Sequence, residues 1–178
     1  MSERTRAHLW AMRSLFAALC AAVIFCRILP LSTLPSGWAG PDLIMALAFA
    51  WVLRRPQYAP PLLIALVVLL ADLMFQRPPG LWAALIVLAC EALKARAPGL
   101  RDMGFGPEWL MVAVTALGVT IIYRLSLAIL LVPQAPLGLS LMQMAMTVLC
   151  YPLVVMVSSL LLGVRKARPS EGGIRGRI

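Results

Sequence analysis

The sequence predicts an all-α, polytopic membrane protein with six transmembrane helices. Of its 178 residues, 62% are hydrophobic and only 13% are charged, and the mean hydropathy is +0.91. Soluble domains have about 45–50% apolar and about 25% charged residues, so a soluble fold of this size could not cover so much apolar surface. The formal net charge is +9, and most of that charge stands at the ends of apolar segments, as is typical of membrane proteins.

Six apolar segments, separated by turn-rich or charged stretches, account for the predicted helices. They cover about residues 9–29, 41–53, 60–75, 81–93, 109–132 and 139–164. A hydrocarbon core of about 30 Å takes about 20 helical residues to cross, and the first, fifth and sixth segments reach that length. The second and fourth are shorter, so we expect them to extend into their flanks or to pack inside the protein. An alternative with four or five crossings stays open.

The segments predict a single transmembrane domain over residues 1–164, followed by a basic, disordered cytoplasmic tail over residues 165–178. The first segment shares a basic start with signal peptides. However, its apolar run is long for such a peptide and carries Arg27 near its end, which favours a retained helix.

Lysine and arginine predict the orientation, because they are enriched in cytoplasmic loops of membrane proteins. With a cytoplasmic N-terminus, six crossings place the basic stretches 54–55, 94–101 and 165–177 in the cytoplasm. The outer connections 30–40 and 133–138 then contain no lysine or arginine. We therefore expect a multi-pass membrane protein with both termini cytoplasmic.

The residue types needed for catalysis or metal binding are nearly absent, so we expect no enzyme, metal or cofactor. The single histidine, His8, lies beside the N-terminal basic residues and has no partner ligand in the sequence. The four cysteines all lie in apolar segments without C-x-x-C spacing, which predicts buried thiols: Cys20, Cys26, Cys90 and Cys150. The basic residues do not gather on a polar face with aromatic neighbours, so nucleic acid is not an expected partner.

A few ionisable residues lie within or beside the apolar segments, where each charge is costly and needs a partner or a function. Asp42 follows a proline at a predicted helix start, which indicates a cap. For Asp72 we expect an ion pair with Arg27, Arg77 or Arg124. Arg124 is the deepest charge, and a pairing with Asp72 or Asp42 is the first expectation. Asp42, Asp72, Arg77 and Arg124 are thus the structural or partner-facing candidates.

Other residues in the segments have simpler interpretations. Glu91 and Lys94 stand three residues apart on a predicted helix, a spacing typical of a local ion pair. The five tryptophans fall near predicted segment ends, as in an interfacial aromatic belt: Trp10, Trp38, Trp51, Trp82 and Trp109.

Two stretches resemble the MreD family of bacterial rod shape-determining membrane proteins. They are Pro41-Asp42-Leu43, with the stop Arg54-Arg55-Pro56, and Ala71-Asp72-Leu73-Met74-Phe75-Gln76-Arg77-Pro78-Pro79-Gly80-Leu81-Trp82. The family has a Pro-Asp helix start and, later, a Gly-Leu-x-x-Asp stretch leading to a Pro-Leu-Gly-type turn. Here Leu69, Leu70 and Ala71 precede the aspartate, so the match is partial and covers about residues 40–95.

The resemblance implies a non-enzymatic subunit of the cell-elongation complex that directs peptidoglycan synthesis, located in the bacterial cytoplasmic (inner) membrane. Its direct partner would be the scaffold protein MreC. Through the complex it would meet RodA, its penicillin-binding transpeptidase and MreB, with membrane lipid around it. The family is also similar in fold to the substrate-binding subunits of energy-coupling-factor vitamin transporters, which implies a six-helix bundle with a cavity near the outer face.

Two alternatives stay open. A vitamin-binding transporter subunit would need polar residues converging on an outward pocket, and the outer connections contain few. A membrane-embedded enzyme would need a nucleophile and a base, and the sequence shows no such set. We expect Asp42, Asp72 and Arg124 to organise the bundle and its partner-facing surface.

Overall fold

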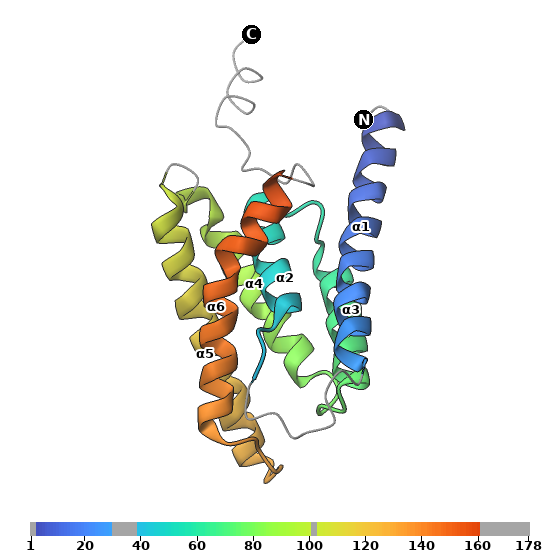
Figure 1. Cartoon of the computed structure of the whole chain (residues 1–178). Coiled ribbons are helices and arrows are strands. Elements are labelled where there is room, and N and C mark those ends of the chain that lie inside the picture. The colour runs from blue at the N-terminus through green and yellow to red at the C-terminus, as the bar shows by residue number, and fades with distance from the viewer. Residues whose placement is uncertain (1–2, 30–38, 101–102, 161–178) are drawn as a thin grey trace.

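The structure, a computed structural model, describes residues 3–29, 39–100 and 103–160, and in that part the regular secondary structure is all helical (Figure 1). The helices are α1 (Glu3–Ile28), α2 (Leu43–Arg54), α3 (Pro61–Met74), α4 (Leu81–Leu100), α5 (Phe105–Ile129) and α6 (Leu137–Leu160). The predicted all-α class is confirmed for these residues. The predicted tail, residues 165–178, lies outside them.

The helices pack side by side as one bundle (Figure 1). Contacts join α1 to α3, α3 to α4, α4 to α5 and α5 to α6, while α2 contacts α1, α4 and α6. Figure 1 shows the start of α1 and the end of α6 at the same end of the bundle. We call this the Arg54 end, with the α2–α3 turn at 55–60. The opposite, Asp42 end contains residues 39–42, 75–80 and 130–136.

Helix α2 is the core of the bundle, although it is the shortest helix. Nine of its twelve residues are buried, among them Phe49 and Trp51. At 1.5 Å per residue α2 spans about 18 Å, well below the roughly 30 Å of a hydrocarbon core. A helix surrounded by protein does not have to match the lipid thickness, which makes this short helix stable.

Helix α4 extends into its flank, which is one of the two outcomes that we expected for the short fourth segment. We expected 81–93, whereas α4 continues to Leu100. Alanine, lysine and arginine in this continuation are good helix formers. Leu93, Ala97 and Leu100 lie on one face and are buried, so the extra turns still pack on the bundle. Helix α1 also begins earlier than expected, at Glu3, and α5 begins at Phe105 rather than Trp109.

Helix α1 packs on the bundle along one face. Its fully buried side chains recur every fourth residue, at Met12, Phe16, Cys20 and Ile24. Partly buried side chains beside this stripe also pack against the core: Leu9, Leu15, Leu19 and Val23. These residues share one face of the helix, and the opposite face is directed away from the bundle.

Three helices are long and apolar enough to cross a membrane: Arg6–Ile28, Phe105–Ile129 and Leu137–Leu160. Their outward faces carry large apolar side chains that are exposed, such as Leu110, Val114 and Leu125 on α5 and Leu153 on α6. Such faces are covered by lipid in a membrane protein. The three helices therefore indicate a membrane protein.

A buried polar network joins α2, α5 and α6 near the Arg54 end. The Arg54 Nη2 lies 3.2 Å from Glu108 Oε1, and the Tyr151 hydroxyl donates to the same oxygen at 2.8 Å. Glu108 is 1% exposed. Trp51 Nε1 donates to Ser158 Oγ at 3.2 Å, one turn away. From the sequence we interpreted Arg54 only as evidence for the orientation in the membrane, and Glu108 only as part of a polar connection. The sequence therefore did not predict this network.

Several smaller expectations can be compared with the structure. The Glu91–Lys94 pair is confirmed at 3.3 Å. The buried-thiol prediction is confirmed for Cys20 and Cys90, but it is wrong for Cys26, which is exposed because it lies off the buried stripe of α1.

The predicted tryptophan belt is wrong for one described member. Trp51 is fully buried, because α2 has no lipid-facing side. Trp10, by contrast, is 66% exposed near the Arg54 end. Trp38 lies outside the described residues.

We predict that Glu108→Ala lowers the free energy of unfolding in detergent by about 3–5 kcal/mol, because it leaves the Arg54 charge buried without its carboxylate. Tyr151→Phe removes one hydrogen bond and should cost about 1 kcal/mol. The control is Glu91→Ala, which breaks an exposed pair worth at most about 1 kcal/mol. Denaturant unfolding of the purified chain measures all three. A Glu108→Ala loss no larger than that of Glu91→Ala would contradict a stabilising network.

Candidate functional site: the polar pocket at the Asp42 end

Asp42 caps helix α2 and ties it to α6. Its Oδ1 accepts a hydrogen bond from the Met45 N–H at 3.1 Å, which confirms the predicted cap. Its own N–H donates to Thr147 Oγ1 at 2.8 Å. Oδ2 lies 3.7 Å from Nη1 of Arg77. Asp42 therefore connects the start of α2 with α6 and with the α3–α4 turn.

Asp72 also caps a helix. The ion pair that we predicted for its side chain is not found among the described residues. Its Oδ2 accepts hydrogen bonds from the Gly80 N–H at 3.2 Å and the Ala83 N–H at 3.1 Å, at the start of α4. Among the described residues no cation lies within ion-pair distance of Asp72. The side chain is fully buried, and its Oδ1 accepts no hydrogen bond there. The positive end of the α4 dipole takes the place of the expected arginine.

The α3–α4 turn explains how Asp72 reaches α4. Gln76 adopts the left-handed conformation with φ of 55°. The Gln76 N–H donates to the Leu73 carbonyl at 3.4 Å, and the Arg77 N–H donates to the Asp72 carbonyl at 3.0 Å. These are the two hydrogen bonds of a Schellman motif, which reverses the chain at a helix end. Gly80, with φ of 86°, then completes the turn in a conformation that favours glycine.

Helix α5 ends in the same motif. Leu131 has φ of 54°, the Leu131 N–H donates to the Ala128 carbonyl at 3.2 Å, and the Val132 N–H donates to the Leu127 carbonyl at 3.0 Å. A non-glycine residue in this conformation costs about 1 kcal/mol. A glycine in the left-handed conformation usually marks this motif in a sequence. Gln76 and Leu131 occupy that position here, so no glycine indicated where α3 and α5 end.

Arg124 does not pair with either aspartate, which corrects the expectation for this residue. Its Nη1 donates to the Ala135 carbonyl at 3.0 Å and to Ser140 Oγ at 2.7 Å. The Gln134 side-chain amide donates in turn to the Arg124 carbonyl at 3.0 Å. The α5–α6 turn follows Arg124 closely in sequence, so these acceptors are local. Arg124 thus fixes that turn and the start of α6.

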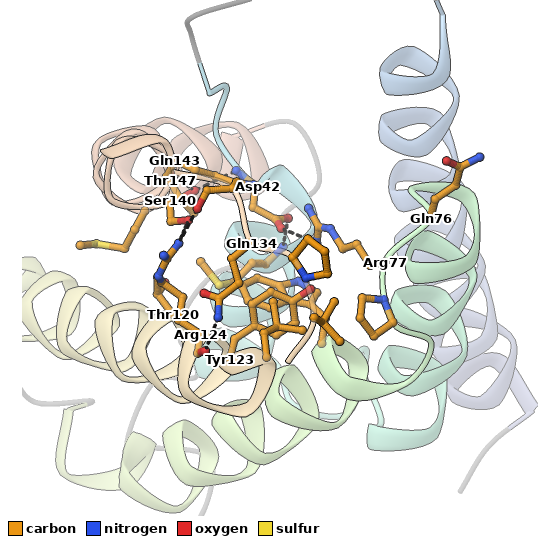
Figure 2. Close-up of a pocket in the computed structure, with 18 residues that line it drawn as sticks. Asp42, Gln76, Arg77, Thr120, Tyr123, Arg124, Gln134, Ser140, Gln143 and Thr147 are labelled. Carbon is orange, nitrogen blue, oxygen red and sulfur yellow. Dashed lines mark hydrogen bonds and ion pairs between the residues drawn. The ribbon is translucent and has the colours of Figure 1, made fainter. Parts of the chain in front are cut away.

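These residues surround a pocket of about 310 Å³, which we call the Asp42 pocket (Figure 2). Arg77 and Arg124 both line it, and Figure 2 shows Arg77 beside Asp42 on one side and Arg124 bonded to Ser140 on the other. Further polar lining comes from Thr120, Tyr123, Gln134, Gln143 and Thr147. Of the four candidates from the sequence, the structure brings together Asp42, Arg77 and Arg124. Asp72 lies outside the lining and supports the turn.

Aromatic rings hold the Arg77 side of the pocket. The Arg77 guanidinium lies 5.5 Å from the Phe75 ring centre and 5.3 Å from that of Trp82. Trp82 in turn contacts Tyr123 edge to face, with ring centres 4.8 Å apart. These cation–π contacts orient the guanidinium without using its N–H donors.

The sequence reasoning missed the contribution of α6. Ser140, Gln143 and Thr147 all line the pocket. Their spacing of three and four residues places them on one face of a helix, so this polar stripe in an apolar segment was a readable signal.

The pocket contains groups that can bind a ligand. It offers two guanidinium groups, one carboxylate, hydroxyls and amides. Within the described residues, no three histidine, cysteine, aspartate or glutamate side chains come together as metal ligands. No protein-family model, curated protein sequence or solved structure matches the chain.

We predict that Asp72→Ala lowers the free energy of unfolding by about 1–2 kcal/mol, because the buried start of α4 loses its acceptor. Asp72→Asn keeps an acceptor oxygen and should cost less than half as much, since asparagine and aspartate cap helices about equally well. Thermal unfolding of both variants in the same detergent makes the comparison. Equal losses would show that the charge of Asp72, and not its capping oxygen, stabilises the protein.

Proposed function

We propose that the chain crosses the bacterial inner membrane six times, with the Arg54 end in the cytoplasm. The distribution of charge supports this orientation. At the Asp42 end, each described arginine is bound to the protein: Arg27 to the Gly40 carbonyl at 3.3 Å, Arg77 to Asp42 and Arg124 to Ser140. The Arg54 end adds exposed basic residues, among them Arg6 and Arg96. An excess of free positive charge favours the cytoplasmic side.

We further propose that the chain is a non-enzymatic, MreD-like subunit of the cell-elongation complex and binds the scaffold protein MreC. One observation carries this proposal. The two stretches that resemble the MreD family, 41–43 and 71–82, form one unit at the Asp42 end. The Asp42–Arg77 pair joins them, and each supplies an aspartate that caps a helix. The similarity thus falls on residues with connected structural roles rather than on scattered apolar positions.

The test is affinity purification of the tagged chain from its native membrane in a mild detergent, followed by mass spectrometry. We expect to recover MreC, with RodA and its transpeptidase in smaller amounts. Arg77→Gln, which breaks the link between the two stretches, should lower MreC recovery several-fold. Lys94→Gln removes the same charge at the other end of the bundle and should leave MreC recovery unchanged. Absence of MreC from the wild-type sample would refute the proposal.

A substrate-binding subunit of a vitamin transporter is the second candidate, and the Asp42 pocket is the observation that favours it. At about 310 Å³ the pocket lies near the lower limit of small-molecule sites, which span about 300–1,000 Å³. Recovery of a transmembrane coupling subunit with paired ATPases in the same purification would support this candidate instead.

A further inference from the structure

We infer that the Asp42 pocket binds the phosphate headgroup of an amphiphile. The inference depends on the lining of the pocket and is independent of the partner proposed above. Two guanidinium groups, those of Arg77 and Arg124, share the pocket with one carboxylate.

That carboxylate neutralises the arginines only in part. Asp42 uses Oδ1 to accept the Met45 N–H, and its Oδ2 lies at the long distance of 3.7 Å from Arg77. Asp42 makes no ion pair with Arg124. The pocket therefore keeps a net positive charge between walls of low dielectric, where a charge attracts an anion more strongly than in water.

Arg124 also has N–H donors that no described residue accepts. Both of its hydrogen bonds to the protein come from Nη1, which leaves Nε and Nη2 without an acceptor among the described residues. A guanidinium presents its N–H groups as a planar fork that matches the oxygens of a phosphate. Tyr123 and Gln143 add a hydroxyl and an amide whose side chains make no hydrogen bond within the described chain. The pocket thus holds uncommitted donors of several kinds.

The lining also has an apolar part, which assigns the remainder of the ligand to a hydrocarbon chain. Met45, Leu127, Val132 and Met144 all face the pocket. A sugar or another polar group would leave these side chains in contact with polar atoms, whereas a hydrocarbon chain continues their apolar surface. At the start of the adjoining α5–α6 turn, Leu130 and Leu131 are 61% and 90% exposed, so this part of the surface beside the pocket is apolar as well.

The experiment is a titration of the purified full chain in a nonionic detergent, followed by native mass spectrometry. The probes are dioleoyl phosphatidic acid, dioleoyl phosphatidylcholine and glycerol 3-phosphate. The first two share their hydrocarbon chains, and the third carries the phosphate without them. We expect saturable binding of phosphatidic acid at one site, at least about tenfold tighter than either of the other probes.

Variants connect the binding to the pocket. Arg124→Gln should weaken phosphatidic acid binding by about tenfold, the usual effect of losing one charged donor. Gln143→Met should weaken it by about threefold, and it disturbs no hydrogen bond of the fold because only the Gln143 backbone carbonyl is used. Arg6→Gln, an exposed arginine at the opposite end, is the charge-matched control and should bind as the wild type does.

Three results would overturn the inference. Equal affinity for phosphatidylcholine would remove the role of the anionic headgroup. Equal affinity for glycerol 3-phosphate would make the ligand a soluble phosphate ester. Unchanged affinity in a folded Gln143→Met, together with an Arg124→Gln no weaker than Arg6→Gln, would place the lipid elsewhere. Unfolding temperatures of all variants establish that each is folded.

Discussion

The constraint on which this structure depends is that a helix ending inside an apolar bundle must have its terminal backbone groups satisfied by the protein. Water does this for soluble proteins, but it is scarce within a membrane. At the Asp42 end two aspartates meet the requirement, Asp42 for α2 and Asp72 for α4. Two Schellman motifs, at Gln76 and Leu131, do the same for the carbonyl ends of α3 and α5. The pocket lies among these four helix ends.

The two ends of the bundle use charge differently. At the Arg54 end a charge pair with Tyr151 is buried and joins three helices, so its cost of desolvation is balanced by close contacts. At the Asp42 end the two arginines are partly exposed, the ion pair is long, and a cavity lies between the arginines. The polar groups of the network at the Arg54 end are therefore bound to one another, whereas the Asp42 end retains polar groups that can still form interactions.

Much of the fold was predictable from local pattern. Apolar segments and the turns between them located all six helices, and Pro41-Asp42 correctly predicted a capped helix start. The site was harder to predict from the sequence, because it depends on how the chain reverses direction between helices. Asp72 reaches the N–H groups of residues 80 and 83 only because Gln76 adopts a left-handed conformation. The sequence gives no sign of this conformation, because the residue is not a glycine. The Arg54–Glu108 contact joins residues far apart in sequence and has no local signal. The α6 polar stripe was readable in principle.

Helix α1 packs against the core through its buried stripe and through the partly buried side chains beside it. Its last turn also reaches the Asp42 end, since Arg27 donates to the Gly40 carbonyl, two residues before Asp42. The chain that enters α2 is therefore held by two other helices, by Arg27 of α1 at residue 40 and by Thr147 of α6 at residue 42. The position of Asp42 in the pocket thus depends on α1 and α6 as much as on its own helix.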